Sequence, residues 1–189
     1  ARGFAAGGVG GREWSGEVAA LGDGVTDLAV GDRVMCTGNG AYAEYAVTLS
    51  ARAWKVPGNN MSLEQAATLP VSLQTMHNAI VTAGRMERDD AVLIQGASSG
   101  VGILGMQIAK YMGARLVIGT STHDGRRAQL TEYGADIALD SKSPDWADKV
   151  LEATDGKGVD LIVDQVSGGV MNNNLRATRI LGRIVNVGR

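Results

Sequence analysis

The stretch Ala91-Val-Leu-Ile-Gln-Gly-Ala-Ser-Ser-Gly-Val-Gly102 decides the fold of this 189-residue chain. Its first four residues are continuously apolar, and its glycine-rich part opens a segment whose apolar residues share one helical face. A buried strand, a glycine-rich turn and a helix N-terminus in this order form a phosphate-binding corner, because glycines let the backbone approach a pyrophosphate and unpaired N–H groups receive its charge. A second apolar run at Arg115–Gly119 supplies the following strand that this pattern requires.

Composition limits the class of protein. The net charge of −2 and the pI near 5.7 argue against the basic footprint of a nucleic-acid-binding protein. The single cysteine, Cys36, excludes an internal disulfide and a multi-cysteine zinc cluster. No run approaches the ~18 apolar residues of a membrane span and no signal peptide is visible, so we expect a cytoplasmic protein without a membrane partner.

The first 88 residues differ in their sequence pattern from the rest of the chain. Residues 1–57 contain short β-like runs between glycine turns, at Gly16–Ala20, Asp32–Cys36 and Ala41–Val47, which predict a small β domain. Residues 58–88 are expected to be connecting helices. Ser62 and Gln65 have the spacing of a capping box, and the helix that they begin should break near Pro70, before a second helix over about 71–82.

From residue 89 to residue 189 the pattern alternates between strand and helix. Continuously apolar runs of this kind are typical of strands covered on both faces of a parallel sheet. We therefore predict an α/β fold, a doubly wound parallel sheet of about five strands that binds its ligand at the carboxyl ends of the strands. The predicted strands are Ala91–Ile94, Arg115–Ile118, Ile137–Leu139, Val159–Val163 and Ile184–Val187.

The end of the second predicted strand favours NADPH as the cofactor. NAD-binding domains usually place a carboxylate there, but this strand is followed by the hydroxyls of Thr120 and Ser121 and then by Arg126 and Arg127. Arginine can bind a 2′-phosphate through two hydrogen bonds. The alternatives are that the two arginines only form a solvated helix face, and that Asp124 binds the ribose of NAD.

Several ordered motifs extend over essentially the whole chain. They are Gly11-Arg-Glu-Trp-Ser-Gly-Glu-Val, Val30-Gly-Asp-Arg-Val, Gly40-Ala-Tyr-Ala-Glu-Tyr, Glu64-Gln-Ala-Ala-Thr-Leu-Pro, the stretch 92–102, Gly134-Ala-Asp, Thr154-Asp-Gly-Lys-Gly-Val-Asp and Gly182-Arg-Ile-Val-Asn-Val-Gly. With these motifs the chain resembles the zinc-free quinone oxidoreductase and enoyl reductase branch of the medium-chain dehydrogenase/reductase superfamily. The resemblance implies a partial GroES-like β domain followed by a C-terminally truncated Rossmann domain, because full-length members extend at both ends.

Three departures from the superfamily pattern bear on chemistry. Zinc alcohol dehydrogenases have a histidine ligand where this chain has Arg12, and a guanidinium cannot bind zinc. The cysteines of their structural zinc loop are also missing, so we expect no metal site. Ala97 and Ser99 stand where the usual fingerprint has glycine, although both are small enough for a pyrophosphate to approach.

The resemblance implies an enzyme that transfers hydride from NADPH to a quinone or to an α,β-unsaturated carbonyl without zinc, and a homodimer in the full-length form. The alternatives are a zinc-free alcohol or aldehyde reductase, a non-catalytic NADPH-binding or structural relative, and a fragment that is inactive alone. A short-chain dehydrogenase is disfavoured because no lysine stands four positions after any tyrosine.

The residues expected at the site form four groups. We assign Ser99, Gly100, Val101 and Gly102 to the pyrophosphate; Thr120, Ser121, Arg126 and Arg127 to the 2′-phosphate; Asn186 and Gly188 to the nicotinamide ribose; and Thr75 and Tyr42 to the catalytic side. For Thr75 the alternative is a hydroxyl that bonds its own helix backbone. For Tyr42 the alternative is an aromatic in the core of the β domain.

Overall fold

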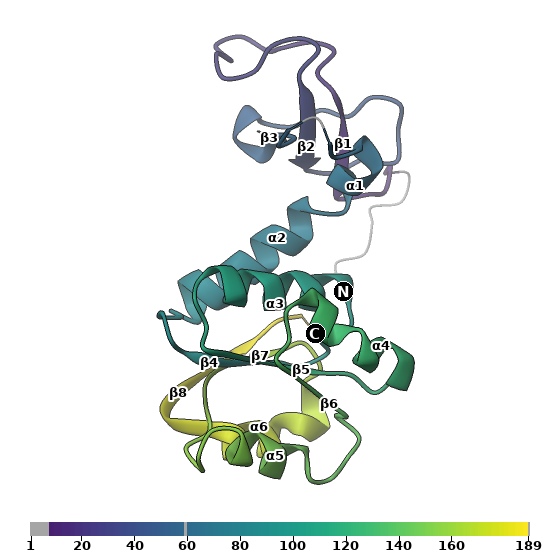
Figure 1. Ribbon diagram of the computed structural model, residues 1–189. Coiled ribbons are helices and arrows are strands. Elements are labelled where there is room, and N and C mark those ends of the chain that lie inside the picture. Colours follow the sequence, from purple (N-terminus) through teal and green to yellow (C-terminus); the bar gives the residue numbers. More distant parts are fainter. Residues whose placement is uncertain (1–7, 59, 189) are drawn as a thin grey trace. The chain divides into compact units, whose positions relative to one another are not determined.

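The computed structural model describes residues 8–58 and 60–188, which fall into two compact units divided between Ser72 and Leu73 (Figure 1). The first unit contains an antiparallel sheet of β1 (Glu13–Glu17), β2 (Arg33–Thr37) and β3 (Ala53–Lys55), in that order, with a 3₁₀ turn at Ser50–Arg52 before β3. Burial alternates along β2, as expected for a strand with one covered face.

The β domain follows the sequence prediction only in part. The run Ala41–Val47 forms no strand, because its backbone is irregular and the side chains of Tyr42, Tyr45 and Val47 are exposed. The third strand lies instead at Ala53–Lys55, and β1 begins three residues before the predicted run. The prediction for this segment was therefore wrong in position, although the β character of the domain is confirmed.

Two helices follow the sheet as the sequence predicts. The capping box at α1 (Leu63–Ala67) is present, since Ser62 Oγ accepts the Gln65 N–H at 3.2 Å and Gln65 Oε1 accepts the Ser62 N–H at 3.0 Å. Pro70 is the first residue of α2 (Pro70–His77), where its missing N–H costs nothing. A short π-helix, Asn78–Ala83, continues α2.

A carboxylate from β1 closes the amino end of α2. Glu13 Oε2 accepts the Val71 N–H at 2.8 Å, 58 residues away in sequence. We expect Glu13→Ala to lower the free energy of unfolding by about 1 kcal/mol, through the lost cap and the lost charge at the helix dipole. Glu13→Gln keeps an acceptor and should recover most of that loss. Urea unfolding measures both, and an unchanged midpoint in Glu13→Ala would contradict the assignment.

The second unit is built on a five-stranded sheet with all strands parallel, which confirms the predicted α/β fold. Its strands are β4 (Ala91–Ile94), β5 (Leu116–Thr120), β6 (Ile137–Leu139), β7 (Val159–Asp164) and β8 (Thr178–Asn186). Their order is β6-β5-β4-β7-β8. The chain moves outward in one direction from β4 and then returns to begin β7 on its other side, so a topological switch point lies between β4 and β7.

Helices cover both faces of this sheet (Figure 1). On one face α3 (Gly100–Tyr111) packs through Met106 and Ala109 against alternate strand residues such as Val92 and Ile94. On the other face α5 (Trp146–Glu152) and α6 (Met171–Ala177) pack against Ala91 and Leu93. The shorter α4 (Asp124–Ala128) follows β5, with 3₁₀ turns at Leu130–Tyr133 and Gly168–Val170. Strands buried on both sides explain the continuous apolar runs.

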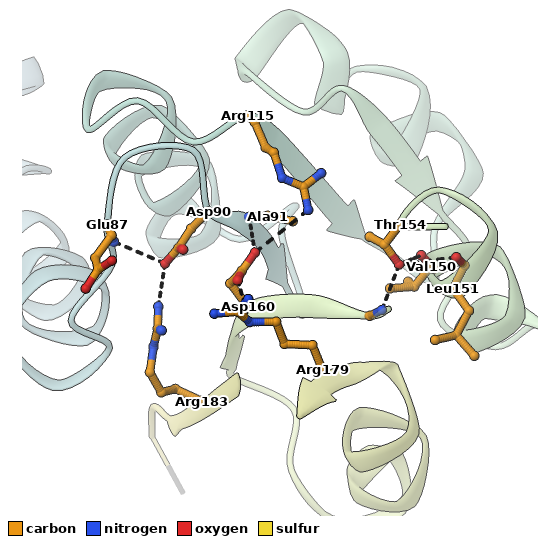
Figure 2. Close-up of polar contacts among 11 residues, drawn as sticks. Glu87, Asp90, Ala91, Arg115, Val150, Leu151, Thr154, Asp160, Arg179 and Arg183 are labelled. Carbon is orange, nitrogen blue, oxygen red and sulfur yellow. Dashed lines mark hydrogen bonds and ion pairs between the residues drawn. The ribbon is translucent and has the colours of Figure 1, made fainter. Parts of the chain in front are cut away.

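Two largely buried carboxylates connect the strands of the sheet near their amino-terminal ends (Figure 2). Asp160 on β7 accepts the Ala91 N–H at 2.8 Å and pairs with Arg179 Nε at 2.6 Å. Asp90, directly before β4, accepts the Glu87 N–H at 3.0 Å and pairs with Arg183 of β8. Both pairs hold β8 to strands further inside the sheet, even though β8 is bulged between its pairings with Val159 and Leu161.

Candidate functional site

Residues 96–102, hereafter the phosphate turn, leave the carboxyl end of β4 and are held against the end of β5. The Gly96 N–H is donated to Thr120 Oγ1 at 3.2 Å, and the Ala97 N–H to the Thr120 carbonyl at 2.8 Å. Gly96 has φ +68, a left-handed conformation that suits glycine, and its carbonyl accepts the Ser99 N–H at 3.1 Å. The turn is therefore held by hydrogen bonds from its own backbone N–H groups to Thr120 and to Gly96.

The phosphate turn offers unpaired donors at the amino end of α3. Ser99 Oγ caps the helix by accepting the Gly102 N–H at 3.0 Å. Within residues 8–58 and 60–188, no hydrogen bond uses the backbone N–H of Ser98, Gly100 or Val101. Three such donors near the start of a 12-residue helix, together with the positive end of its dipole, could bind an anion.

The two glycines at the start of α3 differ in what surrounds them. A Cβ on Gly102 would lie 2.7 Å from both Ala97 Cα and Gly96 O, so glycine is required there by the packing of the turn. A Cβ on Gly100 would meet no protein atom within 4 Å. The protein itself therefore has room for a side chain at Gly100, and this open side of the turn is where a phosphate can approach.

The hydroxyls predicted to face a 2′-phosphate are already bonded within the protein. Thr120 is fully buried, and its Oγ1 donates to Gln95 Oε1 at 2.7 Å. The hydroxyl of Ser121 is 2.9 Å from that of Ser98 and accepts the His123 N–H at 3.3 Å. The structure thus brings both residues to the phosphate turn, where they support it. Their contact with a phosphate stays a prediction.

The two arginines after β5 have different surroundings. Arg127 is held by Asp124 at 2.5 Å and Asp140 at 3.6 Å, and it donates to the Ser121 carbonyl at 3.3 Å. Arg126 is exposed, and its guanidinium makes no ion pair or hydrogen bond with any other residue that the structure describes, although its backbone N–H is donated to His123 Nδ1 at 3.3 Å. Asp124, the alternative ligand for a ribose, is engaged by Arg127. Arg126 is therefore the more accessible cation at this end of the sheet.

The residues assigned to the nicotinamide ribose lie at the carboxyl end of β8. Asn186 Nδ2 donates to Ser167 Oγ at 2.7 Å, and the Val187 N–H is donated to the Asp164 carbonyl at 2.8 Å. Gly188 is exposed with φ +77. These bonds attach the end of β8 to the loop after β7, on the same edge of the sheet as the phosphate turn.

Thr75 and Tyr42, the residues predicted to be catalytic, belong to different units. Thr75 lies on α2 and is partly buried, and its hydroxyl makes no hydrogen bond among the described residues. The alternative in which it bonds its own helix is therefore not seen. Tyr42 is 82% exposed, so the alternative of a core aromatic is wrong. Their catalytic roles stay predictions.

Sequence reasoning missed the polar side chains beneath the phosphate turn. Gln95 and Asn174 are both fully buried and bonded to each other at 2.9 Å. A glutamine that directly follows a buried apolar strand was the available signal, because a buried amide must find partners. Asn174 gave no comparable signal, since it stands within Asn172-Asn-Asn174 and only the packing of α6 decides which of the three is buried.

The part of the chain that the structure describes contains no group of three or more His, Cys, Asp or Glu side chains arranged to hold a metal ion. Arg12 is exposed. Cys36 is buried, and burial raises the pKa of its thiol, which disfavours a nucleophilic role. In residues 8–58 and 60–188 no helix combines the length and apolarity needed to cross a membrane.

Two family models match the chain. Residues 2–58 match the alcohol dehydrogenase GroES-like domain, and residues 100–189 match the family described as zinc-binding dehydrogenase. Among curated proteins, a component of the phenolphthiocerol/phthiocerol polyketide synthase of Mycobacterium tuberculosis is 34% identical over 179 residues, which is 95% of this chain and 8% of that protein. A quinone oxidoreductase of Rattus norvegicus is 31% identical over 94% of this chain and 54% of its own length.

Solved structures agree in fold along nearly the whole chain. An NAD-dependent alcohol dehydrogenase superposes with a TM-score of 0.87 at 31% identity, over 95% of this chain and 60% of its own. The CurK enoyl reductase superposes with a TM-score of 0.88 at 27% identity, over 96% of this chain and 54% of its own. A mycobacterial protein solved with NADPH superposes with a TM-score of 0.83 at 30% identity, over 95% of this chain and 58% of its own. The chain therefore spans little more than half the length of these proteins.

Proposed function

This chain belongs to the medium-chain dehydrogenase/reductase superfamily, and from that premise we propose that it forms the NADPH-binding part of a zinc-free reductase acting on a quinone or an α,β-unsaturated carbonyl. The observation that carries the proposal is the phosphate turn, with its three unpaired N–H groups at the amino end of α3. The absence of a carboxylate directly after β5 and the accessible Arg126 support NADPH over NADH.

The chain's own residues have separable tasks in this function. When bound, NADPH supplies the hydride. The phosphate turn binds the pyrophosphate through the N–H groups of Ser98, Gly100 and Val101, and Arg126 pairs with the 2′-phosphate. The Thr75 hydroxyl, which has no partner in the described residues, supplies a hydrogen-bond donor near the nicotinamide, and Tyr42 supplies one on the substrate side. Arg12 in place of a histidine ligand supports chemistry without zinc.

The resemblance also leads us to propose a cytoplasmic homodimer for the full-length protein. A titration of the purified chain with NADPH, followed by fluorescence, tests the cofactor, with NADH as the control. We expect NADPH to bind at least tenfold more tightly. Equal affinities would overturn the cofactor assignment, and no binding by a folded chain would overturn the site. Turnover of a quinone or an enone by the full-length protein, unaffected by a chelator, tests the reaction.

Replacement of Arg126 separates the 2′-phosphate from the rest of the dinucleotide. We expect Arg126→Ala to weaken NADPH binding about tenfold, because its charge-assisted pairing with the 2′-phosphate is lost, and to leave NADH binding unchanged. Arg127→Ala is the matched comparison, because its guanidinium is held by Asp124 and Asp140. It should change the NADPH affinity less than Arg126→Ala does. The opposite ranking of the two variants would assign the phosphate to Arg127.

A further inference from the structure

Four fully buried side chains connect the phosphate turn to the far side of the switch point. Thr120 Oγ1 donates to Gln95 Oε1 at 2.7 Å, Gln95 Nε2 donates to Asn174 Oδ1 at 2.9 Å, and Asn174 Nδ2 donates to Asp164 Oδ2 at 3.0 Å. We call these residues the polar chain. They come from the ends of β5, β4 and β7 and from α6, and all four are 0% exposed. In such a buried series every hydrogen-bond donor and acceptor must have a partner.

The polar chain has one direction. A carboxylate only accepts, so Asn174 must turn its NH₂ to Asp164 and its oxygen to Gln95. Gln95 in turn must present its oxygen to Thr120, which uses the single hydroxyl hydrogen of Thr120. Only lone pairs of Thr120 Oγ1 then remain, and one of them accepts the Gly96 N–H at 3.2 Å. As an acceptor at one end of the series, Asp164 thereby directs the Thr120 hydroxyl hydrogen to Gln95, so that Thr120 Oγ1 is fully bonded beneath the phosphate turn.

The second oxygen of Asp164 orders the loop after β7. Oδ1 accepts the N–H groups of Val166 and Ser167, each at 2.8 Å. Ser167 adopts φ +60, an unfavourable conformation that these bonds help to hold, and its Oγ accepts Asn186 Nδ2 at 2.7 Å. One carboxylate thus supports both the phosphate turn and the end of β8, the two places assigned to the pyrophosphate and to the nicotinamide ribose.

We propose that Asp164 and Asn174 are positioning residues for the dinucleotide, which set the spacing between the phosphate turn and Asn186 through the polar chain. The inference rests on the proposed function for the identity of the ligand. It assigns Thr120 a supporting role, since its only hydroxyl hydrogen is used by Gln95. Neither Asp164 nor Asn174 contacts the ligand in this assignment, and both act through the backbone of the two segments that they hold.

An exchange of the side chains at positions 164 and 174 tests the positioning role. Asp164→Asn permits the hydrogen bonds of the polar chain to reverse their direction, because asparagine can donate to residue 174. The Thr120 hydroxyl hydrogen is then left without an acceptor under the phosphate turn. Asn174→Asp places two carboxylates together in a buried site. The double variant Asp164→Asn/Asn174→Asp restores every donor–acceptor pair, because residue 174 then accepts from both sides. We expect each single variant to weaken NADPH binding about tenfold, and the double variant to return within about threefold of the natural chain.

A second readout needs no ligand. Hydrogen exchange of the Gly96 amide should be about tenfold faster in Asp164→Asn and restored in the double variant. Thr154→Val is the stability control, because the Thr154 hydroxyl is buried near the amino-terminal end of β7, bonded to the Val150 carbonyl at 2.7 Å and to the Gly158 N–H at 2.9 Å (Figure 2). It should lower the melting temperature without changing Gly96 exchange or NADPH affinity.

The outcomes separate the two proposals. If the natural chain does not bind NADPH but Gly96 exchange responds and is restored as expected, the proposed function fails and the coupling through the polar chain stands. If NADPH binds but the double variant is no better than the single variants, the positioning role is overturned. The role is also overturned if Thr154→Val weakens NADPH binding as much as Asp164→Asn does.

Discussion

Replacement of Gly100 by alanine should weaken NADPH binding about a hundredfold while the protein remains as stable as before. A Cβ at this position meets no protein atom within 4 Å, and alanine is favoured over glycine in a helix, so the free energy of unfolding should be unchanged or higher by up to about 1 kcal/mol. The same methyl group obstructs a phosphate that must approach the N–H groups beside it. Loss of one or two charge-assisted hydrogen bonds, about 3 kcal/mol, corresponds to this change in affinity.

The neighbouring glycine gives the matched control. Gly102→Ala places a Cβ 2.7 Å from Ala97 Cα, so it should cost about 1–3 kcal/mol of stability by overpacking. Urea unfolding and fluorescence titration of the two variants then distinguish a glycine required by a ligand from one required by the protein. An unchanged NADPH affinity in Gly100→Ala would contradict the placement of the pyrophosphate on this turn.

The largest expected loss of stability is for Asp90→Ala, about 3–5 kcal/mol in urea unfolding. The side chain of Asp90 is 10% exposed and that of its partner Arg183 is 20% exposed, and Arg183 Nε is buried without a hydrogen-bond partner among the described residues. Removal of the carboxylate leaves a poorly solvated guanidinium and also frees the Glu87 N–H. Breaking a buried pair from one side is costly for this reason.

A double substitution tests that explanation. Asp90→Ala/Arg183→Met removes both charges and should lose less stability than Asp90→Ala alone, because no unpaired charge remains. Asp148→Ala, which breaks the exposed pair with Arg176, should cost less than about 1 kcal/mol. If Asp90→Ala and Asp148→Ala cost the same, burial of the Asp90–Arg183 pair is not what makes it important.

The sequence predicted the parallel sheet well because its central strands, β4, β5 and β7, are buried on both faces. Continuous apolar runs at Ala91–Ile94 and Ile137–Leu139 have the bounds of β4 and β6. The amino-terminal half of β8 was missed, because its exposed Ile180 and Leu181 and the following Gly182 do not resemble a buried strand. In the β domain, Ala41–Val47 has the composition of a strand but no neighbouring strand to pair with among the described residues, which composition does not reveal.

The candidate site was predictable where the backbone forms it. The order of strand, glycine turn and helix located the unpaired N–H groups of the phosphate turn, and the capping role of Ser99 follows from its position before α3. Side-chain assignments were harder, because a hydroxyl at the end of β5 can face either a ligand or the protein. The buried amide of Gln95 decides this for Thr120, and its position depends on α6, some 80 residues further along the chain.

The single direction of the polar chain also limits how this protein can change through inheritance. Aspartate and asparagine codons differ by one base, so each half of the exchange at Asp164 and Asn174 needs only a single base change. Either step alone disturbs the series, while both together preserve it. A lineage must therefore pass through a weakened intermediate to reach an equally good state. We expect descendants of this sequence to keep Asp164 and Asn174 or to exchange both, so that the two positions covary.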